Sequence, residues 1–478
     1  MVSTTVPIRG RVVVVGGGIA GLAAAHALAV LPADTRPAVT LFEADGRLGG
    51  KVMTVNLGGL RVEAGPDGFL TRLPAAVELC RRLGLAGELV APGQAPAAIW
   101  SRGSLRQIPS GLVLGLPASP TQLIRSGILS WRGIARAALE PLLPRSSTQG
   151  DISVADLVIP RFGRQVFDRL VDPLLSGIYA GRADQLSAGA VVPQLVELAQ
   201  THRSLLLGLR RLPKSRESGP ALNSLSSGLE TMVTTLANVI ENAVDIQIGT
   251  SVTSVQPGAS RTYSVELATG APVQADAVIL AAPAYATSMM LASASPELSA
   301  ELASIPYASV ATVALAYPRQ ALARPLQGSG FLVPRDERRL LVGSTWVTAK
   351  WPHLGSGDQV LIRCAVGRAG DDRWQSLDDE QMIEAVHAEL AEAMGLRSQP
   401  AEAKVIRWPR AMPQYEVGHA ARLRRIEERL ARLPGVFLAG AAYRGVGLTA
   451  CIQQGREAAD KAVEYLSAAS RLGVEAAG

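Results

Sequence analysis

The sequence is poor in cysteine, aromatic residues and charge. Three cysteines, Cys80, Cys364 and Cys451, are too few for a disulfide framework, and none forms a CxxC pair, so no structural metal site is expected. Charged residues make up 18% and hydrophobic residues 48% of the 478 positions, which excludes a disordered polymer. The length is about three times that of a typical ~150-residue domain and predicts two or three structural units.

A strong excess of one charge is also missing. The 47 Lys and Arg residues exceed the 41 Asp and Glu residues by 6, which is too diffuse to predict nucleic-acid binding. The first ten residues are polar and lack the apolar core of a signal peptide, so we expect a cytoplasmic protein. The apolar stretch 12–31 approaches the length of a membrane span, but glycines 16–18 interrupt it and favour a strand, a turn and a helix.

The most informative pattern is this turn, which joins a strand at 12–15 to a helix at 22–30 before a second strand at 39–42. Its spacing of glycines is the fingerprint of a dinucleotide-binding unit, in which backbone N–H groups and a helix N-terminus receive a pyrophosphate. Glu43, 22 residues after the last glycine, is the acid expected to bind a ribose hydroxyl. The residues of the turn are Gly16, Gly17, Gly18, Ile19, Ala20 and Gly21.

Further glycine-rich loops favour an extended dinucleotide such as FAD over NAD. Gly49-Gly50-Lys51 follows Glu43, and Gly65-Pro66-Asp67-Gly68 forms another loop suited to close approach of a ligand. Near the C-terminus, the loop 440–448 leads into a final helix, whose dipole would stabilise negative charge on a reduced flavin. A second GxGxxG turn is missing, so we expect no NAD(P)H domain and expect the electrons to pass to oxygen or another acceptor.

Strand and helix patterns divide the chain into five segments. Strand patterns prevail in 1–88 and 221–290, and helical spacing prevails in 89–220, where we expect no strand-rich run. Strands surround one acidic helix in 291–430, and 431–478 holds a strand, the glycine-rich loop and the last helix. The first, third and fifth segments are predicted to form one cofactor domain, with a helical insertion and a separate α+β domain.

At these motifs the sequence resembles the superfamily of flavin amine oxidases and protoporphyrinogen oxidases. The segment 172–181, Asp-Pro-Leu-Leu-Ser-Gly-Ile-Tyr-Ala-Gly, is similar to the signature of bacterial porphyrinogen oxidases. His202-Arg203-Ser204-Leu205, Pro413-Gln414-Tyr415 with Gly418-His419, and 444–448 with Cys451-Ile452 extend the similarity over essentially the whole chain. The match resembles most closely the bacterial coproporphyrinogen III oxidase branch.

The resemblance implies an α/β fold, with a glutathione-reductase-like (Rossmann-type) FAD-binding domain, an α+β mixed-sheet substrate domain and an inserted helical domain. It implies oxidation of a porphyrinogen to a porphyrin in heme biosynthesis, with three O₂ consumed and three H₂O₂ released. One departure concerns Ala441, because an acidic residue often follows the corresponding strand in the wider group and holds the ribityl chain. The FAD contacts implied are Gly16 to Gly21, Glu43, Lys51, Gly65, Pro66, Asp67, Gly68, Val252, Trp408, Ala441, Val446, Gly447 and Leu448.

The resemblance also places Gly177, Ile178 and Tyr179 along a substrate cavity. A porphyrinogen is an apolar macrocycle with carboxylate arms, and Arg72 is the candidate anchor for a carboxylate because guanidinium binds carboxylate in a bidentate fashion. Aromatisation supplies the driving force, so no dedicated general base is required, and no catalytic side chain is predicted. No GxSxG, HExxH or P-loop motif is present to support a hydrolase or a nucleoside triphosphatase.

Several alternatives stay open at this point. The substrate could be protoporphyrinogen IX, or the enzyme could be an amine oxidase, although aromatics are only 4% of the chain and Arg444 would repel a cationic amine. The protein could also be a non-catalytic carrier of porphyrin. Porphyrinogen and O₂ are the expected small-molecule partners, and a downstream chelatase is the expected transient protein partner. Basic residues in 111–144 and in 203–216, including Lys214 and Arg216, could contact the inner face of the cell membrane peripherally.

Overall fold

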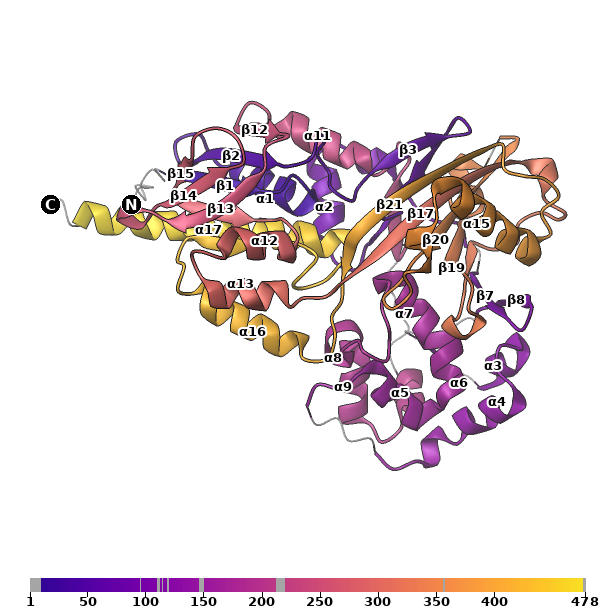
Figure 1. Ribbon diagram of the computed structural model, residues 1–478. Helices are drawn as coiled ribbons and strands as arrows, with labels where there is room; N and C mark the ends of the chain where they lie inside the picture. The colour runs from indigo at the N-terminus through magenta and orange to yellow at the C-terminus, as the bar shows by residue number, and fades with distance from the viewer. Residues whose placement is uncertain are drawn as a thin grey trace.

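The computed structural model describes residues 10–94, 96–109, 112–113, 115–117, 120–145, 150–211, 220–355 and 357–475, so Lys214 and Arg216 lie outside the described residues. Figure 1 shows three lobes: a cofactor lobe at the left, a substrate lobe built on a large sheet at the right, and a helical lobe below the sheet. The last described helix, Leu448–Glu475, ends at the left edge of the cofactor lobe.

A five-stranded parallel sheet forms the centre of the cofactor lobe, in the order β12-β2-β1-β16-β22. Val12 pairs with Val39 on one side and with Ala277 on the other, so strands from three distant segments become neighbours. The strands predicted at 12–15 and 39–42 are confirmed as β1 Arg11–Val15 and β2 Ala38–Glu43. The other strands of the sheet are β12 Val244–Ile248, β16 Ala277–Leu280 and β22 Val436–Leu438.

Alternate residues of β1 enter different cores, because successive side chains of a strand point to opposite faces. Val12 and Val14 pack against a layer of helices, whereas Val13 and Val15 face a small antiparallel sheet and more helices. The first layer comprises α1 Ile19–Ala29, α2 Ala75–Arg82, α11 Glu230–Ile240 and α17 Leu448–Glu475. The second comprises β13 Val252–Pro257, β14 Tyr263–Leu267, β15 Val273–Ala275, α12 Ala284–Leu291, α13 Pro296–Ala303 and α16 His419–Leu430.

The substrate lobe is built on a seven-stranded mixed sheet in the order β21-β17-β20-β19-β18-β7-β8. One face packs on α15 Asp379–Met394, which Asp378 caps, and the other face packs on the β3–β4 hairpin, Thr54–Leu57 and Leu60–Glu63. This hairpin places the loop after Glu63 beneath the sheet. The strands are β7 Ala98–Ser101, β8 Ser104–Gln107, β17 Tyr307–Pro318, β18 Gly330–Leu332, β19 Leu341–Trp346, β20 Gln359–Val366 and β21 Glu402–Pro413.

The expectation that no strand-rich run interrupts 89–220 is wrong, because short strands occupy much of 89–117. The hairpin β7–β8 turns at Arg102-Gly103, where both residues have positive φ, and β7 pairs with β18 from the substrate lobe. Three two-residue strands also lie in this segment: β6 Leu89–Val90, β9 Leu112–Val113 and β10 Leu116–Pro117. Strand β6 pairs with β11 Leu222–Leu225, and β9 pairs with β10. A strand of two residues is too short for an alternating pattern to be visible in the sequence.

The helical lobe follows, and its buried side chains form a separate core. A π-helical turn, Phe167–Val171, immediately precedes α7 Asp172–Tyr179, and Ala180 ends α7 in a left-handed conformation. The other helices are α3 Pro120–Ser126, α4 Trp131–Ala138, α5 Val154–Phe162, α6 Arg164–Val166, α8 Ala188–Val191, α9 Pro193–Thr201 and α10 Leu205–Arg211. Over the described residues, no helix combines the length and hydrophobicity needed to cross a membrane.

Candidate active site

The glycine turn between β1 and α1 is shaped first by the chain's own packing. Gly16 has a φ of +105°, and its N–H donates to the carbonyl of Phe42 at 2.8 Å. A Cβ atom on Gly21 would lie 1.9 Å from the Gly16 carbonyl oxygen, so only glycine fits there. The turn therefore needs Gly16 and Gly21 for folding, whether or not a ligand is bound.

Gly18 is different, because a Cβ atom added to it would meet no protein atom within 4 Å. It is the N-cap of α1, with a φ of −70°, and no side chain caps the helix there. The first N–H groups of α1 are consequently left for another partner, and the helix dipole favours a negative one. This open cradle fits the pyrophosphate of a dinucleotide.

Glu43 lies at the end of β2, beside this cradle, and is 8% exposed. Its Oε2 accepts the N–H of Gly17 at 2.6 Å, and its Oε1 accepts the N–H of Asp45 at 2.8 Å. The carboxylate thus fixes the glycine turn while keeping lone pairs for a ribose hydroxyl. Val252, the first residue of β13, is buried close by, since Thr250 donates to the Glu43 carbonyl at 2.8 Å.

The loop 47–51 folds back onto the glycine turn. Gly49 donates to the Gly17 carbonyl at 2.8 Å, and the Arg47 guanidinium holds the carbonyls of Leu48, Gly50 and Val52. Lys51 has solvent-accessible surface, yet the surrounding protein desolvates its ammonium and lowers its pKa. The Lys51 ammonium has no ion pair among the described residues, so it can receive an anionic ligand.

The loop 65–68 is held from the substrate lobe. The Ala64 carbonyl accepts from Thr312 Oγ1 at 2.7 Å and from Trp408 Nε1 at 3.0 Å, and Arg363 donates to the Gly65 carbonyl. Asp67 forms an ion pair of 2.6 Å with Lys350. Trp408 therefore lies beside the loop 65–68. No sequence motif indicates Thr312, Lys350 or Arg363, because only the folded sheet brings them to the loop.

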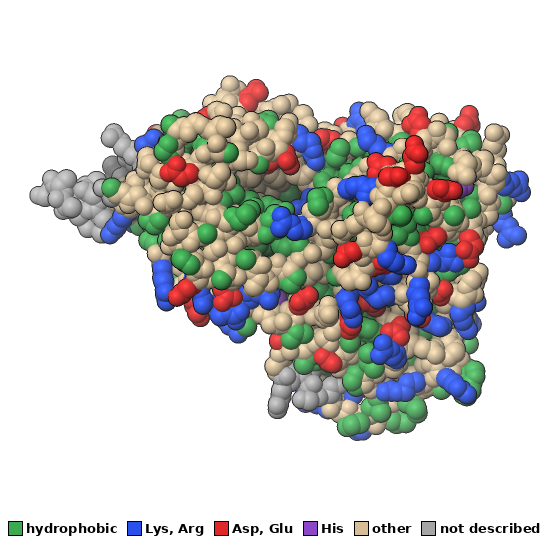
Figure 2. All heavy atoms as spheres, viewed as in Figure 1, with side chains coloured by type: hydrophobic (Ala, Val, Ile, Leu, Met, Phe, Trp, Pro, Cys, Tyr) green, Lys and Arg blue, Asp and Glu red, His purple; other side chains and the backbone are tan. Residues whose placement is uncertain are grey.

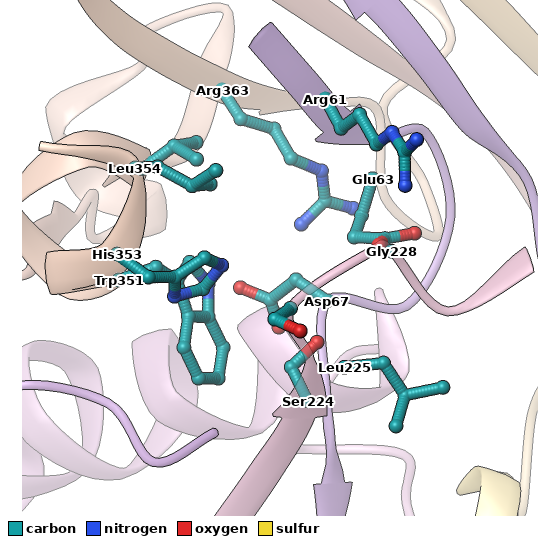
Figure 3. A pocket seen from close by; sticks show the side chains of 12 residues that line it. Arg61, Glu63, Asp67, Ser224, Leu225, Gly228, Trp351, His353, Leu354 and Arg363 are labelled. Carbon is teal, nitrogen blue, oxygen red and sulfur yellow. The ribbon is translucent and has the colours of Figure 1, made fainter. Parts of the chain in front are cut away.

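A small pocket, open to solvent, adjoins this loop. Figure 3 shows the charged side chains of Arg61, Glu63, Asp67 and Arg363 around it, with Trp351 and His353 on the facing side. Because neither Gly18 nor Gly447 lines it, this pocket is distinct from the cradle at the glycine turn.

The two acids of the pocket differ in their ionisation. Burial raises the pKa of Glu63 to about 7, against the opposing hydrogen bonds from Leu229 and Thr54. Burial also opposes ionisation of Asp67, but the cations Lys350 and Arg363 outweigh it and lower the pKa. Only Glu63 is therefore expected to change its charge near neutral pH.

The C-terminal loop meets the N-terminal turn through α1 and α17. A Cβ atom on Gly455 would lie 2.1 Å from the Ala20 carbonyl oxygen, and Leu466 packs beside Gly10, so the two helices run side by side in the same direction. Gly455 is seven residues into α17, which places the start of α17 about 10 Å beyond that of α1. The two helix N-termini can thus serve two ends of one extended ligand.

Gly447, directly before α17, is open in the same way as Gly18, because an added Cβ atom there would meet no atom within 4 Å. Ala441 and Val446 are half-buried in the same loop, and Leu448 begins α17. Arg444 is exposed and paired with Glu427, so its charge is compensated there, and the expectation that Arg444 repels a cationic substrate is not supported.

Apolar and cationic side chains meet near the end of α7. Ile178 is 46% exposed, and Leu70 and Leu73 are exposed on the segment that carries Arg72. Burial raises the pKa of Tyr179, and the Arg72 guanidinium opposes that shift, which places Arg72 within electrostatic reach of Tyr179. Among the described residues, Arg72 makes no hydrogen bond or ion pair. Gly177 packs against Leu332, since an added Cβ atom would lie 3.1 Å from its side chain.

The molecular surface is hollowed between the cofactor lobe and the substrate lobe, and hydrophobic side chains line this hollow with basic side chains at its edge (Figure 2). A site with apolar walls and a few cations suits a large apolar molecule that carries carboxylates. The structure therefore offers a dinucleotide cradle at two helix N-termini and a neighbouring region suited to an anionic, apolar substrate.

Comparison with known proteins gives consistent results. A profile of the family described as flavin containing amine oxidoreductase matches residues 19–463. The coproporphyrinogen III oxidase of Bacillus subtilis (strain 168) is 37% identical over 467 residues, covering 95% of this chain and 98% of that protein. The protoporphyrinogen oxidase of Bos taurus is 32% identical over 489 residues, covering 94% and 97%. A crystal structure from Exiguobacterium sp. 255-15, provisionally assigned as a protoporphyrinogen oxidase, has a TM-score of 0.86 and 33% identity, covering 95% and 98%.

Proposed function

The chain belongs to the flavin containing amine oxidoreductase family, and from that membership we propose that it oxidises coproporphyrinogen III to coproporphyrin III. The predicted fold class is confirmed, and the chain is an FAD-dependent oxidoreductase. The reaction removes six electrons and six protons, which three O₂ accept to give three H₂O₂. The observation that carries the proposal is the 37% identity with a coproporphyrinogen III oxidase over 95% of the chain.

We propose that FAD lies across the starts of α1 and α17. Gly18 leaves room for the pyrophosphate, Glu43 accepts from a ribose hydroxyl, and Gly447 leaves room for the ring system. The proposed contacts are those implied by the resemblance: Gly16 to Gly21, Glu43, Lys51, Gly65, Pro66, Asp67, Gly68, Val252, Trp408, Ala441 and Val446 to Leu448. When bound, FAD supplies the two-electron acceptor for each oxidation step.

The side chains of the chain bind and orient the substrate. The Arg72 guanidinium would hold a propionate, while Ile178 and Tyr179 would lie along one side of the macrocycle. Because burial raises the pKa of Tyr179, its phenol stays neutral and does not repel the substrate's carboxylates. Apolar walls also exclude water from the reacting carbon, and the gain of aromaticity drives the oxidation without a dedicated base.

The experiment compares coproporphyrinogen III and protoporphyrinogen IX on one preparation under air. We expect porphyrin fluorescence to grow with both, a higher kcat/KM for coproporphyrinogen III, and three H₂O₂ for each porphyrin. A higher kcat/KM for protoporphyrinogen IX would reassign the substrate. Porphyrin fluorescence that does not grow with FAD-loaded protein would favour a carrier. Release of H₂O₂ from amines would favour an amine oxidase.

We further propose a cytoplasmic enzyme that contacts the membrane peripherally through the tip of the helical lobe. Trp131 and Leu142 are both 73% exposed, and Arg125 and Arg132 are exposed beside them. Glu140, the acid of this stretch, is buried against Arg161. Figure 2 shows hydrophobic side chains gathered with basic ones at this end of the lobe. Such a surface suits anionic lipid.

Co-sedimentation with vesicles tests this contact. We expect binding to vesicles with about one third anionic lipid, and we expect Trp131→Glu with Leu142→Glu to reduce it at least about tenfold. Ile248→Glu, a change of an exposed residue in the cofactor lobe, is the control. Since the porphyrin product is poorly soluble, we also propose transient contact with a downstream chelatase, which should raise the rate of product transfer when both enzymes are mixed.

A further inference from the structure

Tyr415 connects two parts of the molecule that the proposed function uses separately, the loop 440–447 and the end of α7. Its side chain is 2% exposed and belongs to the core of the helical lobe, 6.1 Å from the Tyr179 ring between centroids. Val446 of the loop packs against the same core. Tyr415 follows the end of β21 in the substrate lobe. It thus joins the helical lobe to a loop of the cofactor lobe.

The Tyr415 hydroxyl makes two hydrogen bonds to the backbone of the loop. It donates to the Ala441 carbonyl at 2.6 Å and accepts the Gly445 N–H at 2.9 Å. Since a hydroxyl has one hydrogen, the first bond requires a protonated phenol. Burial raises the pKa of Tyr415 well above its usual range, so the phenol keeps this proton at neutral and moderately alkaline pH.

His419 adds a third attachment. Its ring stacks on that of Tyr415, with centroids 4.2 Å apart and planes inclined by 11°. His419 Nε2 lies 3.0 Å from the Tyr443 carbonyl oxygen, which can only accept, so Nε2 carries a hydrogen. Nδ1 is buried and has no partner within the described chain, and burial lowers the pKa, so the ring is neutral.

Gln414 attaches the same segment to α7. Its amide donates to the Tyr179 carbonyl at 2.9 Å, at the end of the helix that carries the proposed substrate contacts. Gln414 therefore holds the end of α7, while Tyr415 and His419 hold the backbone of the loop 440–447. Such a clamp can keep both in a fixed relation.

The loop needs such attachment because it is rich in glycine. Gly440 and Gly445 have φ values of +125° and +114°, and Gly447 faces open space. A glycine-rich loop loses much conformational entropy when it is ordered, and a ligand that must order it binds more weakly. Hydrogen bonds that order the loop before the ligand arrives therefore increase affinity.

We propose that Tyr415 is a positioning residue for the cofactor: through Ala441 and Gly445 it orders the loop that leads into α17 and so sets the affinity and reduction potential of bound FAD. This inference rests on the part of the proposed function that places FAD at Gly447 and α17, and it is independent of which substrate is oxidised. A core residue of the helical lobe then controls cofactor binding in another lobe.

The test compares Tyr415→Phe with Tyr263→Phe. Both changes remove a buried phenol oxygen and keep the ring; Tyr263 is 4% exposed and donates to the Pro434 carbonyl at 3.0 Å, outside the loop. FAD is titrated into apoprotein by fluorescence quenching, and the reduction potential of the loaded protein is measured by dye equilibration. We expect Tyr415→Phe to raise the Kd for FAD about 10- to 30-fold and to shift the potential, as the loss of two hydrogen bonds predicts. Tyr263→Phe should change the Kd by less than about twofold.

His419→Phe keeps the stacked ring and removes only the bond to Tyr443, and we expect about a threefold to tenfold rise in Kd. This variant decides the question if Tyr415→Phe does not accumulate as folded protein. A Kd and potential in Tyr415→Phe that match those of Tyr263→Phe would overturn the proposal. The titration uses no porphyrinogen, so failure of the substrate assignment leaves this result intact, and unchanged FAD affinity leaves the substrate assignment intact.

Discussion

Among single residues, Arg72 differs from the paired arginines of the described chain because its guanidinium has no hydrogen-bond or ion-pair partner there. Two other arginines near the lobe boundaries have partners: Arg363 holds the Gly65 carbonyl, and Arg335 lies 3.9 Å from Asp172. Arg72 is exposed next to Leu70 and Leu73, and no described side chain neutralises it. Its charge is therefore available to a ligand.

We expect Arg72→Met to raise the KM for coproporphyrinogen III about 10- to 100-fold with little change in kcat. A charge-assisted bond to a carboxylate of about 1.5–3 kcal/mol would be lost equally from substrate and transition state. Arg81→Met, on the exposed face of α2, is the matched control and should leave both constants unchanged. Steady-state kinetics by porphyrin fluorescence gives the answer, and a fall in kcat at constant KM would contradict a binding role.

Glu63 makes the stability of the protein depend on pH. Its pKa of about 7 lies above the value of about 4.5 in the unfolded chain, so the folded state binds this proton more tightly. The contribution of Glu63 to the free energy of unfolding therefore falls as pH rises from about 4.5 to about 7 and is constant above that range. Arg363 and Asp67 are the charged groups facing it, and they act in opposite directions.

Glu63→Gln removes this titration while keeping an oxygen that can accept the Leu229 N–H, which Glu63 now accepts at 2.7 Å. When the pH is raised from 5 to 8, we expect the free energy of unfolding of wild type to fall by about 1 to 3 kcal/mol relative to that of the variant. Urea denaturation at both pH values measures the difference. An equal difference at pH 5 and pH 8 would show that Glu63 ionises normally.

At the scale of elements, the starts of α1 and α17 share a feature, an open glycine that the protein itself does not need. Gly18→Ala and Gly447→Ala should fold normally, because neither added methyl group meets a protein atom within 4 Å and neither glycine has a positive φ. We expect the Kd for FAD to rise at least about tenfold in each, since the methyl group takes space that the cofactor requires.

Gly87→Ala, another open position on the short helix 86–88, is the control and should bind FAD like wild type. Thermal unfolding of all three apoproteins checks that the changes act on the cofactor and not on the fold, because alanine at a compatible glycine position does not destabilise. Gly21→Ala should instead fail to fold, given the 1.9 Å approach to Gly16. Normal FAD affinity in Gly18→Ala would place the pyrophosphate elsewhere.

Elements with strong local patterns could be predicted from the sequence, and elements that depend on distant partners could not. The turn at Gly16–Gly21 and the strands around it were predicted because glycine spacing and buried valines are local signals. Helix α1 begins at Ile19, earlier than the predicted residue 22, because the turn ends at Gly18. The hairpin β7–β8 was missed because its partner β18 lies more than 200 residues later.

The same distinction applies to the site. Its glycine loops are visible as motifs, whereas the Asp67–Lys350 ion pair joins residues separated by 283 positions and carries no local signal. Which glycines face open space also depends on the packing of α17 against α1, and spacing alone treats Gly18 and Gly21 alike. The predicted domain boundaries and the individual FAD contacts stay predictions.

At the scale of the whole molecule, the central sheet collects strands from residues 11–43, 244–280 and 436–438, and α17 returns to pack on α1. A ligand that lies across both helix starts must therefore restrain segments from opposite ends of the chain at once. Binding to the folded state stabilises it by about 2.7 kcal/mol when free FAD is 100 times its Kd. That stabilisation should appear in both segments.

Hydrogen exchange with and without FAD provides the measurement. We expect peptides covering 16–21, 65–68 and 441–448 to exchange at least about tenfold more slowly with FAD present, with one common dependence on FAD concentration. Peptides from α4, 131–138, at the tip of the helical lobe, should not change. Protection restricted to 16–21 would mean that the cofactor ends at the first turn, because a dinucleotide confined there cannot reach the start of α17, about 10 Å farther along.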